Sequence, residues 1–199
     1  EIMKTSAVLE RLIPRFHAYI DTMPQEEPDV KLNFQLKRDH TTRVCSEMRQ
    51  IAARLQLDRH ETALAEICAL LHDIGRFEQY RRYRTFMDPV SIDHAELAVQ
   101  IIDQLELLRG LNDTDRYLVR VAIANHNRIA IDPAIDRRPR FFAMMLRDAD
   151  KLDIWDLVIR YYSEEVRNEA VKLGLSLDNT VTPAVFDALM SGRLGRKED

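Results

Sequence analysis

Hydrophobic side chains recur at intervals of three and four residues along most of the chain, while alternating runs of β-branched residues are few. Such spacing places apolar side chains on one face of an α-helix. Only five of the 199 residues are glycines, which also suits a mostly helical chain. The pattern therefore predicts an all-α protein, a bundle of helices folded as a single compact domain.

The predicted helices are separated by short segments that contain proline, glycine and polar residues. We expect helices over residues 3–20, 32–56, 58–72, 91–108, 113–127, 141–153 with a continuation over 155–172, and 182–191. Asp58 and Ser91 are the predicted caps of two of these helices, and Pro28 and Pro139 are assigned to loops. Residues 75–89 are dense in arginine and aromatic side chains, and we expect them to form a loop or a broken helix.

Within the single domain, the helices fall into three parts. Residues 1–30 form an N-terminal helix and loop, and residues 31–160 form the helical core. Residues 161–199 are expected to form C-terminal helices that pack on this core. The tail after residue 191 is expected to fray, as chain ends commonly do.

The composition narrows the classes of partner. A net charge of −4 offers no broad positive surface for a nucleic-acid polymer or an anionic membrane. No apolar run approaches the ~18 residues of a membrane-spanning helix. Cys45 and Cys68 lie within helical patterns and lack the spacing of a disulfide framework, so we expect a reduced, cytoplasmic protein. The composition allows an oligomer but does not predict one.

Four of the six histidines fall on the apolar side of a predicted helix, where an imidazole needs a partner. These histidines are His40, His72, His94 and His126, and Asp73 directly follows His72. Any one alone fits a core histidine bonded to a backbone carbonyl, but together they favour a metal site built between helices. Periodicity leaves Asp148 and Asp150 as alternative carboxylates from the helix over residues 141–153.

The order of these residues resembles a known family. His40, then His72-Asp73, then a late aspartate looks like the H…HD…D signature of the HD-domain superfamily of metal-dependent phosphohydrolases. Residues 72–75 spell the family's HDIG turn, in which Gly75 is expected to let the backbone turn away. The resemblance spans about residues 36–155 and implies the HD-domain helical fold. It also selects Asp150, because the family's last ligand usually precedes a basic residue.

The other two histidines resemble the additional ligands of the family's two-metal branch. The ligands implied for one ion are His40, His72, Asp73 and Asp150, and those implied for a second ion are His94, His126 and a bridging Asp73. With only the first set in use, the centre reduces to one ion. Nitrogen and oxygen ligands suit Mn, Fe, Co, Ni, Mg or Zn, so one or two divalent ions are expected without a choice of metal.

The implied activity is hydrolysis of a small phosphorylated substrate, a phosphomonoester or phosphodiester, with nucleotides among the candidates. A bound divalent ion lowers the pKa of its water from about 15.7 towards ~7, which makes hydroxide available at neutral pH. Asp73, Arg76 and Lys151 are the predicted catalytic residues, and Arg76, Arg84 and Lys151 are predicted to bind the substrate. For Lys151, an ion pair with a neighbouring helix is an equal alternative.

Two other functions stay open. A similar ligand layout with two irons is known among relatives that activate oxygen and oxidise an organic substrate, and no residue here excludes it. A non-enzymatic binding module whose metal only staples the helices is less favoured, because structural sites usually close at four ligands. The chain also departs from two branches of the family: Arg76 stands where many relatives have lysine, and the Gly-Tyr-Pro element of cyclic-dinucleotide phosphodiesterases is absent.

Overall fold

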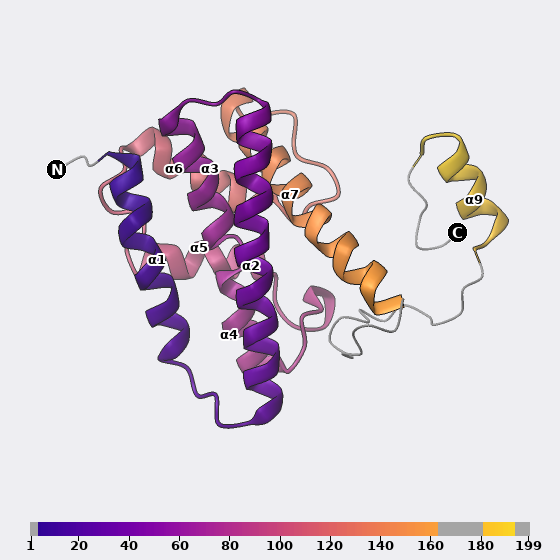
Figure 1. Ribbon diagram of the computed structural model, residues 1–199, viewed down its shortest axis with the longest axis horizontal. Helices are drawn as coiled ribbons and strands as arrows, with labels where there is room; N and C mark the ends of the chain where they lie inside the picture. The colour runs from indigo at the N-terminus through magenta and orange to yellow at the C-terminus, as the bar shows by residue number, and fades with distance from the viewer. Residues whose placement is uncertain (1–3, 163–180, 194–199) are drawn as a thin grey trace.

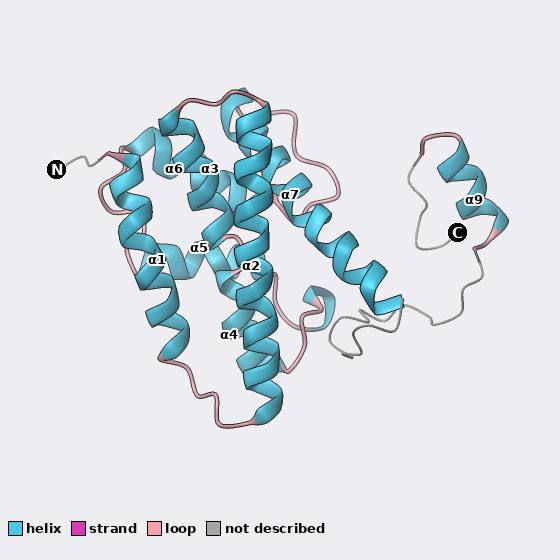
Figure 2. Ribbon diagram, in the orientation of Figure 1, coloured by secondary structure: helices cyan, strands magenta, loops and turns pink. Residues whose placement is uncertain are grey.

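The computed structural model describes residues 4–162 and 181–193, and Figures 1 and 2 show this part of the chain as helices joined by loops, with no strand. The helices are α1 (Thr5–Asp21), α2 (Pro28–Arg54), α3 (Arg59–Leu71), α4 (Ile74–Tyr83), α5 (His94–Gln104), α6 (Asp113–Asn125), α7 (Arg137–Tyr162) and α9 (Pro183–Met190), with the short 3₁₀ helix η1 (Asp88–Val90). The prediction of an all-α domain is confirmed.

The bundle is organised around α2 and α3. The 27-residue helix α2, about 40 Å long, packs against α3 and α7. Helix α1 also packs against α3. In the rest of the bundle α4 packs against α5, α5 against α6, and α6 against α7. Phe77 of α4 joins the first two helices to the rest, because its ring lies edge-on to Phe16 of α1 and Phe34 of α2, with centroids 5.9 and 5.2 Å away.

Three predictions about helix starts are wrong. Pro28, expected in a loop, opens α2, because a first-turn proline has no hydrogen bond to lose there and its φ already suits a helix. Pro139 likewise lies in the first turn of α7. The cap of α5 is Asp93 rather than Ser91: Asp93 Oδ1 accepts hydrogen bonds from the amides of Ala95 and Glu96 at 2.9 and 3.2 Å. Asp58 does cap α3, as predicted.

The arginine-rich stretch after Gly75 is more regular than expected. Residues 74–83 form α4, in which Arg81 and Arg82 both pair with Glu78 at 2.6 Å, one turn earlier. Such pairs support a helix. The residue that follows the helix, Arg84, has a left-handed φ of 54°. From there the chain continues into η1. This break turns the chain back towards the start of α5.

The C-terminal part is described only in pieces. Helix α7 reaches residue 162, and the rest of the helix predicted over residues 155–172 lies outside the described residues. As predicted, α9 begins at Pro183, where Thr182 Oγ1 accepts a hydrogen bond from the Val185 amide. Figure 1 shows α9 apart from the other helices. The division at residues 30 and 160 stays a prediction. Among the described helices, none has the length and hydropathy of a membrane span.

Candidate metal centre

The structure brings the six predicted metal ligands together in the middle of the bundle. They come from five places in the fold: α2, the α3–α4 junction, the first residue of α5, the end of α6, and α7. In that order they are His40, His72 and Asp73, His94, His126, and Asp150. All are buried except Asp150, which is partly exposed. Ligands separated by up to 110 residues in the chain thus share one site.

One half of the centre, here named the His40 group, consists of His40, His72, Asp150 and the Oδ2 atom of Asp73. His40 Nε2 lies 3.4 Å from His72 Nε2, 3.1 Å from Asp150 Oδ1 and 3.4 Å from Asp73 Oδ2. His72 Nε2 lies 3.7 Å from each of the same two carboxylate atoms. Ligand atoms that share one ion at about 2.0–2.2 Å are themselves roughly 3–4 Å apart, so this group fits a divalent cation.

The other half, here named the His94 group, consists of His94, His126 and the Oδ1 atom of Asp73. The Nε2 atoms of the two histidines are 3.0 Å apart. Asp73 Oδ1 lies 3.4 Å from His94 Nε2 and 3.9 Å from His126 Nε2. The two oxygens of one carboxylate therefore face different groups, which is the arrangement of a bridging ligand.

The outer nitrogens of the four histidines are all held by hydrogen bonds. In each ring Nδ1 lies 2.6–2.7 Å from an oxygen, and these oxygens belong to Asp153 beside His40, Ala69 beside His72, Asp88 beside His94, and Ile123 beside His126. A backbone carbonyl can only accept, so His72 and His126 donate from Nδ1 and turn the lone pair of Nε2 inwards. Such outer hydrogen bonds orient metal-binding imidazoles.

His72 and His126 reach the centre in the same way. Each is the residue after a helix, α3 or α6, and each donates from Nδ1 to the carbonyl three residues earlier, that of Ala69 or Ile123. The last carbonyls of a helix lack intrahelical partners, so the imidazole satisfies one of them. The helix end thereby fixes the ring that presents the ligand.

Gly75 acts differently from the expected turn. It lies inside α4, and its φ is not among the positive ones. A Cβ at this position would lie 2.3 Å from the His94 carbonyl oxygen and 2.8 Å from the Ala98 nitrogen. Only glycine therefore lets α4 and α5 approach this closely. The contact brings His94 against Asp73, so the glycine serves the His94 group through packing.

Charges around the two carboxylates keep them ionised. Burial acts to raise the pKa of Asp73, but Lys37 and the neighbouring imidazoles, together with Arg76, hold it well below its usual value. Burial also opposes ionisation of Asp150, whose pKa is held well below the usual value by hydrogen bonds from two histidines. Both carboxylates are thus anionic at neutral pH, the form in which a carboxylate can bind a cation.

The histidines of the two groups differ in protonation. Burial lowers the pKa of His94, and burial with nearby imidazoles lowers the pKa of His126 to about 3. Burial and Lys37 also oppose a charge on His40, but hydrogen bonds to three carboxylates raise its pKa to about 10. In the metal-free protein at pH 7, the imidazoles of His94 and His126 are therefore neutral, whereas the imidazole of His40 carries a proton.

Three residues near the centre were missed by sequence reasoning. Lys37 Nζ lies 2.8 Å from Asp73 Oδ2, and Asp153 accepts from His40 and from Arg43. Lys37 precedes His40 by three residues, and Asp153 follows Asp150 by three, so helical spacing could have found both.

Asp88, the third missed residue, had no such signal. It lies in η1, where Oδ2 accepts from His94 Nδ1 at 2.6 Å and Oδ1 accepts from Arg76 at 2.8 Å. Asp88, Asp93 and His94 are close enough to hold an ion by themselves. Because both oxygens of Asp88 are engaged in these hydrogen bonds, we assign it to the support of His94.

The predicted substrate-binding residues lie at different depths. Arg76 is close to the centre: its Nε lies 3.5 Å from Asp73 Oδ1, and its Nη1 donates to Asp88 and to the Phe86 carbonyl. Arg84 is farther out and pairs with Glu27 at 2.6 Å. Lys151 is exposed on α7. The structure therefore brings Arg76, but neither Arg84 nor Lys151, into contact with the metal ligands.

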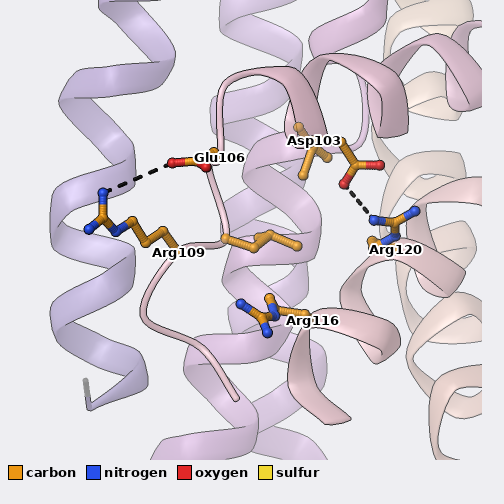
Figure 3. Close-up of a pocket in the computed structure, with 7 residues that line it drawn as sticks. Asp103, Glu106, Arg109, Arg116 and Arg120 are labelled. Atoms are coloured by element: carbon orange, nitrogen blue, oxygen red, sulfur yellow. Dashed lines mark hydrogen bonds and ion pairs between the residues drawn. The ribbon is translucent and has the colours of Figure 1, made fainter. Parts of the chain in front are cut away.

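A pocket of about 730 Å³ lies at the opposite end of α5 (Figure 3). Its lining residues are Ile102, Asp103, Glu106, Leu108, Arg109, Arg116 and Arg120. Figure 3 shows Asp103 facing Arg120, at 2.6 Å, and Glu106 facing Arg109, at 4.0 Å. Asp103 is about 14 Å along the helix axis from His94. Because acids neutralise these arginines, we assign no ligand to this pocket.

Similarity to known proteins extends over more than half of the chain. A family model described as the HD domain matches residues 38–155, a range that includes every residue of both groups. Among solved structures, one from an uncultured Thermotogales bacterium, described as a predicted HD superfamily hydrolase, is 24% identical. That alignment covers 87% of this chain and 84% of the other, with a TM-score of 0.48. None of the curated proteins searched matches this chain.

Proposed function

The chain belongs to the HD-domain family, and we propose that it is a metal-dependent phosphohydrolase that acts on a small phosphoester at this centre. The observation that carries the proposal is the position of Asp73, with Oδ2 towards His40 and Oδ1 towards His94. A bridging carboxylate suits two ions that leave positions open for a substrate, whereas structural sites close at four ligands.

The residues present fit such a metal centre. The ligands we propose for one ion are His40, His72, Asp73 and Asp150. Those we propose for the other are Asp73, His94 and His126, on the distances between their ligand atoms. Held by these residues, a divalent ion would supply a bound water of lowered pKa and a positive charge for a phosphoryl oxygen. The imidazoles need no rearrangement, because the hydrogen bonds at Nδ1 already orient the four rings.

Two cationic side chains at the centre favour an anionic substrate. Arg76 is held in place by Asp88 and by the Phe86 carbonyl, so its guanidinium is positioned before a substrate arrives. Lys37 lies 2.8 Å from Asp73 Oδ2 and 5.1 Å from the centroid of the Phe86 ring. We assign both to binding phosphate oxygens, with Arg84 as a proposed outer contact. For Lys151 we favour the alternative, an ion pair with another helix.

The buried surroundings of the centre favour chemistry that depends on charge. His72 and Asp73 are almost fully buried, and the attraction between ions and a phosphate is stronger where water is excluded. Asp150 is partly exposed, which leaves the centre open on the side of α7. A substrate can therefore approach beside Asp150 while the histidines remain enclosed.

The experiment that tests this proposal is a screen of phosphomonoesters, phosphodiesters and nucleotides with added Mn, Mg, Co, Ni, Zn or Fe. We expect metal-dependent release of phosphate or of a phosphomonoester. In Lys37→Gln, kcat/KM should fall by about a hundredfold because one donor to the developing charge is lost, while metal content is unchanged. Lys31→Gln is the matched control, since Lys31 is exposed on the same helix.

The alternative functions have distinct outcomes in this screen. Oxygen consumption that depends on iron and an organic substrate, without any phosphoester cleavage, would favour a di-iron oxygenase. Metal binding that stabilises the fold, with neither reaction, would favour a binding module. Either result would overturn the assignment as a phosphohydrolase.

A further inference from the structure

The outer face of α7 carries a stripe of exposed apolar side chains. Phe141, Met144, Leu152 and Trp155 are 37, 52, 46 and 65% exposed. With 3.6 residues per turn, these positions fall within about 100° of the helix circumference. Buried Leu146 marks the opposite face, which packs on the core. In Figure 1 the second half of α7 extends away from the other helices of the bundle.

Two charged residues of opposite sign lie on the same stripe. Asp148 and Lys151 are both exposed, and no ion pair joins either of them to another residue in the described part of the chain. Exposed apolar side chains grouped along one helix face are typical of an interaction surface. A partner that covers this surface must therefore place a cation beside Asp148 and an anion beside Lys151.

The stripe is complementary to itself when reversed. Met144 and Trp155 are equally far from the midpoint between Ala149 and Asp150, and so are Asp148 and Lys151. In an antiparallel pair of α7 helices with a two-fold axis at this midpoint, Met144 faces the partner's Trp155. Asp148 faces the partner's Lys151, and each contact occurs twice, as two-fold symmetry requires.

We propose that the outer face of α7 is a docking surface for a second copy of this chain, packed antiparallel across that two-fold axis. The contacts suit one another chemically: a methionine sulfur packs well against an indole ring, and each carboxylate meets an ammonium. Leu152 lies next to the ion pair and shields it from water. The dimer thereby braces the helix whose inner face supplies Asp150 to the metal centre.

Helix α9 is a poorer occupant of this surface. It exposes Phe186, Leu189 and Met190, so it too has an apolar face. However, its sequence from Pro183 to Met190 contains a single charged residue, Asp187. Packed on α7, it would place no cation beside Asp148. A second α7 satisfies both charges.

Charge reversal tests the proposed pairing directly. We expect the full 199-residue chain to sediment as a monomer–dimer mixture whose dimer fraction rises with concentration. Asp148→Lys places two like charges together and should weaken dimerisation by at least about tenfold, as should Lys151→Asp. The double reversal Asp148→Lys with Lys151→Asp should restore it. Asp187→Lys, on α9, is the matched control and should leave dimerisation unchanged.

The single tryptophan provides a second readout. Trp155 fluorescence should shift to shorter wavelength as the dimer forms, and Trp155→Ala should weaken dimerisation at least about tenfold. A chain that stays monomeric at every concentration would overturn the proposal, as would single reversals without effect. A monomer in which Asp187→Lys shifts the Trp155 emission would instead identify α9 as the occupant. Circular dichroism melting is the check that each variant is folded.

Discussion

The two groups of the metal centre share Asp73 and use the same ligand types, yet their electrostatics are opposite. Carboxylates surround His40 and raise its pKa to about 10. Burial and neighbouring imidazoles lower the pKa of His126 to about 3. One group therefore holds a proton where a cation would bind, and the other already offers neutral nitrogens. The neighbours of a histidine thus decide whether a proton competes with a metal for its nitrogen or the nitrogen is already free to bind.

The groups also differ in how their histidines are supported. Around His94 the support comes from η1, where Asp88 holds both the imidazole and Arg76. Around His40 it comes from α7, where Asp153 lies one turn beyond Asp150. The His94 group is thereby tied to a cation proposed to bind substrate, and the His40 group to the helix proposed to dock a second copy. Removing one residue at a time should separate these roles.

The largest effect is expected from removing the shared ligand. Asp73→Asn keeps the size of the side chain but loses the charge that faces both groups. We expect hydrolysis to fall by at least about a thousandfold, because several kcal/mol of metal-dependent stabilisation are lost. Bound metal, measured by elemental analysis after dialysis, should fall in the same variant. A folded variant with unchanged turnover would remove Asp73 from the centre.

A smaller effect is expected when only the His94 group is broken. His126→Gln should lower the metal content from about two ions per chain to about one and hydrolysis by about a hundredfold. The His40 group keeps all of its ligands in this variant. His17→Gln is the control, since His17 is exposed on α1 and pairs with Arg38. Equal metal content in both variants would contradict a second ion.

The outer hydrogen bonds offer a matched pair of substitutions, one in each group. Asp153→Asn weakens the support of His40, and Asp88→Asn weakens that of His94. Each should lower metal affinity by about 10- to 100-fold, the usual cost of losing such a partner. Titration calorimetry should assign each loss to a different binding step. If both substitutions affect the same step, the two groups are not independent.

The smallest effect, taken over a single pH unit, is a difference in pH dependence. Metal must displace the proton that His40 keeps up to about pH 10, so affinity of the His40 group should rise up to about tenfold per pH unit from neutrality towards that value. Metal affinity of the His94 group should change little over this range, because its imidazoles are already neutral and the pKa of His126 is about 3. His126→Gln and His40→Gln isolate the two groups for calorimetry. Parallel pH profiles would contradict the difference.

The same raised pKa gives the metal-free fold a defined pH dependence. Protonation of His40 contributes stability that is complete below its ordinary pKa of 6.5 and is lost as pH rises through about 10. Urea unfolding of the metal-free protein between these values should therefore show His40 contributing less as pH increases. In His40→Gln this part of the slope should be missing.

Helical periodicity predicted that the histidines face the same interior, but it did not predict the residues that hydrogen-bond to them. The histidines lie on the inner face or at the end of a helix, where a spacing of 3.6 residues had placed them. Periodicity left Asp148 and Asp150 as alternatives, and the family resemblance was needed to choose Asp150. Lys37 and Asp153 follow the same spacing from His40 and Asp150 and could have been found. Asp88 could not, because the left-handed Arg84 and tertiary contacts set its path.

Proline and glycine show why some local predictions were wrong. Proline breaks a helix when it lies in the interior but is favoured in the first turn, where Pro28 lies. The sequence alone does not tell whether a proline lies before a helix or in its first turn. Gly75 suggested a turn, whereas its missing side chain is needed for contact with the His94 backbone. Such close approaches depend on packing between helices that are distant in the chain.

The most direct measurement is anomalous diffraction from crystals of the full chain grown with manganese. We predict two anomalous peaks on either side of Asp73, one enclosed by His40, His72 and Asp150 and the other contacting His94 and His126. Occupancy of the first peak should fall at low pH more than that of the second. A structure with no peak between these ligands, or with Asp73 contacting none, would contradict the proposed centre.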